Sequence, residues 1–112
     1  MESSNYAALF TLGDIKASGE HLLWVSVVAQ SMVDASSRDR TIRRGIVAWL
    51  ASEDFEFVCD LASMKHAAVR AIIEDILSTR SKRKAFKKSM QMRFLLRDYL
   101  ESLMGEAYLD RD

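Results

Sequence analysis

A chain of 112 residues, 49% of them apolar and 29% charged, can form one hydrophobic core and is too apolar for a disordered segment. The lack of proline and the presence of only four glycines exclude a turn-rich β architecture and favour helices. Sixteen basic and sixteen acidic side chains cancel, which excludes a strongly basic binder of the histone type. We therefore expect an all-α, single compact domain over residues 1–112, with about five helices.

Several kinds of site chemistry are missing from the sequence. Cys59 is the single cysteine, and with only two histidines it predicts neither a disulfide nor a metal site. Since Cys59 stands between Val58 and Leu61 on an inward helix face, we interpret it as a buried residue and not as a nucleophile. No phosphate loop or zinc motif occurs, so we expect no enzyme, no cofactor and no metal.

The longest apolar stretch, residues 22–29, is too short to cross a bilayer and has no basic segment or cleavage site before it. We therefore expect a cytoplasmic protein without a membrane partner.

The first elements in chain order are an N-terminal arm and a helix. Residues 1–19 mix serines, glycines and short apolar clusters, which predicts an irregular arm. From Glu20 to Ala35, apolar residues recur at three- and four-residue steps, which predicts an amphipathic helix. The members of this stripe are Leu23, Val27, Val28, Met32 and Ala35.

Two shorter helices are predicted next. Ser36 and Asp39 have the spacing of a capping box, so a helix should start near Arg38 and run to Ala51. Its apolar side comprises Ile42, Ile46, Trp49 and Leu50. After a polar break, Asp54 is a suitable N-cap for a short helix that continues through residue 62.

The fourth helix should run from His66 to Leu77, and a long last helix should occupy residues 81–104, ending at Gly105. The apolar residues of this last helix include Phe86, Met90, Phe94, Leu95, Tyr99, Leu103 and Met104. Its second apolar row comprises Met92, Leu96, Tyr99 and Leu103. The apolar face of this helix is therefore wider than one neighbouring helix would cover, and two interpretations stay open. The C-terminal helix forms a homodimer, or it closes the monomer core.

The stretch from Phe55 to Ile73 has the spacing of a helix-turn-helix, within a unit over residues 55–77. Cys59 is the small residue of the first helix, Ser63 stands at the turn four residues later, and Met64 follows as its apolar residue. Further inward positions are Val58, Ala62, Val69 and Ile72. Because positive φ costs serine more than the usual glycine, we expect a longer or differently shaped turn. Two ordinary packed core helices are the alternative.

A wider set of residues extends this pattern over residues 23–73. The set is Leu23-Trp24, Val27, Gln30, Asp34-Ala35, Trp49-Leu50, Ser52, Asp54-Phe55, Val58-Cys59, Leu61-Ala62 and Val69-Arg70. It resembles a group of small, largely uncharacterised proteins encoded by alphaproteobacteria and their phages or prophages. That group usually has Gly-Leu-Asp-Pro where this chain has Ser63-Met64-Lys65-His66. The resemblance implies a helix-turn-helix-like domain in a phage-related setting, without a site list.

Candidate DNA-binding residues follow from the unit. At the start of its second helix, Lys65, His66, Ala67 and Arg70 should face bases, and Arg70 can make a bidentate contact with guanine. Residues 38–88 contain twelve basic and seven acidic side chains, so this part of the chain is electropositive. The cations that could grip phosphates are Arg40, Arg43, Arg44, Lys82, Arg83 and Lys84, together with Arg38, Arg80, Lys87 and Lys88.

These features predict a dimeric transcriptional regulator of phage or mobile-element type that binds double-stranded DNA through a helix-turn-helix. The alternative is a phage-encoded protein-binding module that docks on and modulates a host protein. The balanced net charge and the acidic segment from Glu53 to Asp60 favour this alternative.

Overall fold

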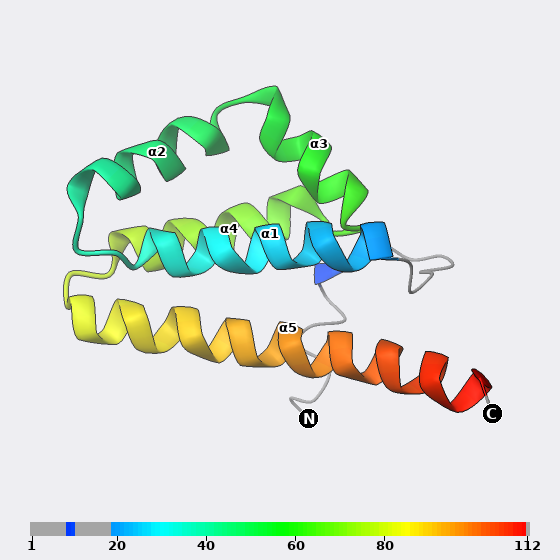
Figure 1. The fold of residues 1–112 in the computed structure, drawn as a ribbon. Coiled ribbons are helices and arrows are strands. Elements are labelled where there is room, and N and C mark those ends of the chain that lie inside the picture. Colours follow the sequence, from blue (N-terminus) through cyan, green and yellow to red (C-terminus); the bar gives the residue numbers. More distant parts are fainter. Residues whose placement is uncertain (1–8, 11–18, 112) are drawn as a thin grey trace.

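The computed structural model is all-helical in its described part, which comprises residues 9–10 and 19–111, with side chains up to residue 99 and at Glu101 (Figure 1). The helices are α1 (Gly19–Ala35), α2 (Arg40–Leu50), α3 (Glu53–Leu61), α4 (His66–Ser78) and α5 (Lys82–Arg111). Since α1 packs against each of the other four helices, it forms the centre of the domain. The all-α fold, its compactness and the long last helix are confirmed.

The helix starts differ from the predicted caps at two places. Asp39 itself is the N-cap of α2, and its carboxylate accepts a hydrogen bond from the Thr41 backbone N–H at 2.8 Å. The predicted capping box is therefore wrong, because the Ser36 hydroxyl donates instead to Val33 O at the end of α1. The N-cap of α3 is Ser52 and not Asp54, which leaves three acidic residues in the first turn, where the helix dipole favours them.

The core combines residues from all five helices. Its largest fully buried side chains include Val25, Val28, Met32, Phe55, Met64, Val69, Ile73, Ile76 and Leu96. The predicted stripe of α1 is correct for Val28, Met32 and Ala35, but Leu23 is 58% and Val27 36% exposed, and Val25 is buried instead. Residues 22–29 are apolar on nearly every side, so periodicity alone does not fix the centre of the buried arc.

The described part of the N-terminal arm lies against the core. Leu9 and Phe10 are both buried, and the Phe10 ring stacks on Tyr99 of α5 with 4.3 Å between ring centroids. Phe10 also forms an isolated antiparallel bridge with Met64. The remainder of the predicted arm, residues 1–8 and 11–18, lies outside the described residues.

The last helix departs from its prediction in length and in the face that it buries. Gly105 does not end α5, which continues to Arg111. A glycine inside a helix costs only about 1 kcal/mol relative to alanine, and good helix formers follow this one. On the inner face, Ala85 and Ser89 are fully buried, whereas Phe86 and Phe94 are each 53% exposed.

The small residues of α5 explain this orientation. The Ser89 hydroxyl lies 3.1 Å from the Ser36 hydroxyl after α1, which large side chains at position 89 would prevent. Further along, Leu96 is buried, and Met92 and Tyr99 pack against the core. Of the two interpretations of this row, closure of the monomer core therefore accounts for its described members; the side chain of Leu103 lies outside the described residues.

Candidate nucleic-acid interface

The turn between α3 and α4 is short and contains one left-handed residue. Ser63 has φ = 56°, in the left-handed region that this position requires. Its N–H donates to Asp60 O at 3.0 Å, and the Met64 N–H donates to Cys59 O at 2.8 Å, as in a Schellman motif. The expectation of a longer or differently shaped turn is therefore wrong, because these hydrogen bonds hold a serine in the conformation that glycine adopts more easily.

The residues predicted to lock the two helices lie inside the molecule. Cys59, Ala62 and Val69 are fully buried, Met64 is nearly so, and Val58 is also buried. Ile72 is half-buried and packs against the core, with Ile73 as the fully buried neighbour. The spacing therefore describes a tightly packed helix pair.

Cys59 behaves as a packing residue. Burial, together with the negative charge of the neighbouring Asp60, raises the pKa of its thiol to about 12. The thiolate that a nucleophile needs is therefore disfavoured at neutral pH.

The start of α4 faces solvent. Lys65 is the N-cap, and Lys65, His66 and Ala67 are all exposed. The backbone beneath them is fixed, because the Lys65 N–H donates to Leu9 O at 2.6 Å. The arm therefore holds the first turn of α4 from the inner side, while the side chains of Lys65, His66 and Ala67 point outward.

Arg70 is half-buried, and its side chain is held by contacts within the domain. Its Nη2 donates to Leu50 O, the last carbonyl of α2, at 2.7 Å. Its guanidinium carbon lies 5.0 Å from the centroid of the Phe55 ring, which in turn packs edge-on against Trp49. Arg70 thus joins α4 to α2 and α3, and it is not presented beside Lys65 as the predicted guanine contact implies.

The other predicted cations gather at the far end of α4. Figure 1 shows α1 ending and α2 and α5 beginning at this end of the molecule. Arg38, Lys82 and Arg83 line one hollow there, together with Asp34. We call this region the basic end and define it by its members Arg38, Arg40, Arg44, Lys82, Arg83 and Lys84. Because α4 has 13 residues, it is about 20 Å long, and this length separates Lys65 from the end of α4 beside the basic end.

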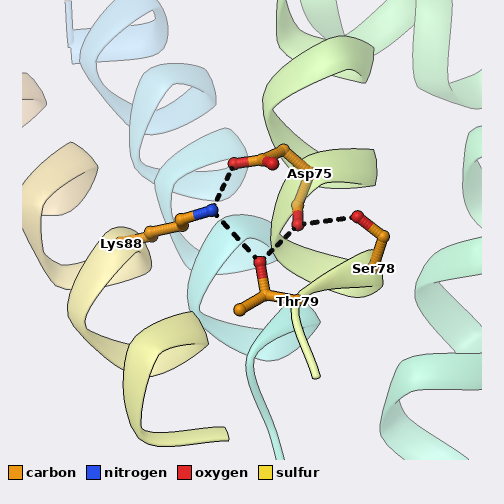
Figure 2. A network of polar contacts seen from close by, with 4 residues as sticks. All are labelled: Asp75, Ser78, Thr79 and Lys88. Carbon is orange, nitrogen blue, oxygen red and sulfur yellow. Dashed lines mark hydrogen bonds and ion pairs between the residues drawn. The ribbon is translucent and has the colours of Figure 1, made fainter. Parts of the chain in front are cut away.

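Two further predicted phosphate contacts are used within the chain. The half-buried Arg43 guanidinium donates to Ser37 O. Lys88 Nζ lies 3.0 Å from Asp75 Oδ2 and 3.2 Å from Thr79 Oγ1, as Figure 2 shows. This contact ties the end of α4 to α5 and neutralises Lys88.

Two residues of the predicted irregular arm shape the site. Leu9 and Phe10 are adjacent large apolar residues in a polar segment, which is a signal of burial that helical periodicity does not include. Their contacts with the turn and with α5 position the start of α4.

No protein family, curated protein or solved structure matches this chain. Among the residues that the structure describes, no three His, Cys, Asp or Glu side chains gather in a way that could hold a metal ion. Within the same residues, no helix has the length and apolar character needed to cross a bilayer.

Proposed function

We propose that the chain binds double-stranded DNA through α3 and α4, as a transcriptional regulator of phage or mobile-element type. The observation that carries this proposal is the turn: Ser63 is left-handed, Cys59 and Met64 are buried beneath it, and Lys65 and His66 are exposed directly after it. In helix-turn-helix proteins, this arrangement leaves the start of the second helix free to enter the major groove.

Base contacts in this proposal come from the first turn of α4. The Lys65 ammonium can reach guanine or phosphate, the His66 ring can hydrogen-bond to a base edge, and the Ala67 methyl can contact a thymine methyl. Arg70 has a positioning role, because its guanidinium fixes α4 to Leu50 O and the Phe55 ring.

Phosphate contacts come from both ends of α4. The first turn of α3 carries Glu53, Asp54 and Glu56, so α3 repels a phosphate backbone. At about 20 Å, α4 is longer than the major groove is wide, about 12 Å. Lys65 and the basic end can therefore reach phosphates on opposite walls of one groove.

The test selects duplexes from a randomised library and measures affinity by fluorescence anisotropy over a salt series. Lys65→Ala/His66→Ala should lose the preference for selected over random duplex by about tenfold or more, and its salt slope should fall by about 1. Arg93→Ala is the charge-matched control, since it removes one exposed cation from α5 outside the basic end. Absence of salt-dependent binding, or an equal loss in the control, would contradict the proposal.

A protein-binding module is the second candidate, and one observation favours it. Phe57, Phe86 and Phe94 are 61%, 53% and 53% exposed, which is unusual for large aromatic side chains. If this candidate is correct, replacing these rings removes capture of a partner and leaves the affinity for DNA unchanged.

A further inference from the structure

The solvent side of α5 carries cations and large apolar residues on one face. Phe86 and Lys87 stand three and four residues after Arg83, Met90 stands four and three residues after these two, and Phe94 stands four after Met90. They therefore share one helix face, which we call the basic stripe. All are exposed except the half-buried Met90, and all five line one hollow. From Ile76 to Arg97 the chain has eight basic residues and no acidic residue.

A second stripe of opposite charge lies on α3. Glu53, Glu56, Phe57 and Asp60 occupy steps of three, four and seven from the first, so they share a helix face, which we call the acidic stripe. All four are exposed, and Phe57 is 61% exposed at the centre of the three carboxylates. The acidic stripe therefore repeats the pattern of the basic stripe with the sign of the charge reversed.

The two stripes of one chain face different directions. Both α1 and α4 pack against α3 and also against α5, so they lie between the two stripe-bearing helices. In Figure 1, α3 and α5 accordingly lie on opposite sides of the α1 and α4 layer. The stripes cannot meet within one molecule.

We propose that the acidic stripe of one copy docks on the basic stripe of a second copy. Phe57 would pack on the Phe86, Met90 and Phe94 side chains, while the carboxylates of α3 meet Arg83 and Lys87. Symmetric pairing of two α5 helices would instead bring cations against cations. The contact joins two different surfaces, so it is head-to-tail and can build rings or open chains of copies. This inference does not depend on DNA binding.

Sedimentation of nuclease-treated protein over a range of concentrations tests the contact. The weight-average mass of the wild type should rise with concentration, and less so at high salt, because the contact depends on charge. Glu56→Lys/Asp60→Lys reverses the acidic stripe, and Arg83→Glu/Lys87→Glu reverses the basic stripe. Each should weaken self-association about tenfold or more. Arg40→Glu/Arg44→Glu, on α2 outside both stripes, is the matched control and should leave self-association unchanged.

Mixing the two reversed variants gives the decisive result. The acidic stripe of Glu56→Lys/Asp60→Lys then carries two lysines beside Glu53 and matches the two glutamates that replace the cations of the basic stripe in Arg83→Glu/Lys87→Glu. The unchanged stripes of the two variants match as before. Association should return in the mixture to nearly the wild-type level. Asp60→Lys at the end of α3 and Arg83→Glu at the start of α5 suit the helix dipole, whereas Glu56→Lys opposes it in the first turn of α3. Phe57→Ala and Phe86→Ala therefore provide uncharged variants that should weaken association as well.

A wild type that stays monomeric over the whole concentration range overturns the proposal. Association that is insensitive to the α3 variants, or that fails to return in the mixture, overturns it too, since the contact then lies elsewhere. Binding of single-stranded oligonucleotide or anionic vesicles that requires Phe86 and Phe94, with no self-association, would assign the basic stripe to those ligands instead.

Discussion

The α3–α4 unit and α5 both pack against the rest of the domain through small residues, but they differ in how far their large apolar residues are buried. In both regions small residues mark the closest approach of helices: Cys59 in the unit, and Ala85 and Ser89 in α5. Apart from Phe57, the unit buries or half-buries its large apolar residues, whereas α5 leaves both Phe86 and Phe94 half exposed. The difference teaches that the large apolar side chains of the α3–α4 unit mainly hold its two helices together, whereas those of α5 are partly available to a partner.

The largest expected effect separates two aromatic residues of α3. Phe55→Ala should lower the free energy of unfolding by about 3–5 kcal/mol, because the fully buried ring packs against Trp49 and leaves a cavity. Phe57→Ala should change it by less than about 0.5 kcal/mol, since Phe57 is largely exposed. Urea denaturation followed by circular dichroism measures both, and equal losses would show that α3 is packed differently.

The buried face of α5 gives the next largest effect. Ser89→Leu should cost about 1–3 kcal/mol of unfolding free energy, because a larger side chain at this fully buried site pushes α5 away from α1. Phe86→Ala, one turn back on the exposed side, serves as the comparison and should cost far less. Thermal denaturation ranks the two variants. A more stable Ser89→Leu protein would mean that the apolar face predicted from side-chain size is the buried one.

Arg70 distinguishes a positioning role from a DNA contact. Arg70→Ala should lower the free energy of unfolding by about 1–2 kcal/mol in the absence of DNA, because the bond to Leu50 O and the contact with the Phe55 ring are both lost. Arg70→Lys should recover only part of this, since an ammonium lacks the planar fork. If the Arg70→Ala protein is as stable as the wild type, Arg70 has no positioning role and is free to contact DNA.

The smallest expected effect concerns the turn. Ser63→Gly should raise the free energy of unfolding by about 0.5 kcal/mol, because glycine relieves the cost of positive φ but has more freedom to lose on folding. Ser63→Val should lower it by about 1 kcal/mol or more, as a β-branched residue resists this conformation. Chemical denaturation resolves the order of the three proteins, and any other order would contradict the left-handed assignment.

The sequence predicted the helices well and the orientation of α5 poorly. The helix-turn-helix spacing located Cys59, Met64 and Val69 correctly, because burial at those positions depends on local periodicity. The buried face of α5 depends on how closely α1 approaches, which periodicity does not report, so the pattern favours the large phenylalanines over the small Ala85 and Ser89 that are buried. The partner of Arg70 is a backbone carbonyl 20 residues away, and neither composition nor local spacing predicts a contact between residues so far apart in the sequence.

The most direct test of the central claim is an NMR titration, in which the backbone amide signals of isotope-labelled protein are followed as a selected duplex is added. If the first turn of α4 enters the groove, the largest shifts should fall on Lys65, His66 and Ala67, with smaller shifts at the basic end. Shifts confined to α3 and the basic stripe of α5, or no shifts at all, would contradict DNA recognition by the helix-turn-helix.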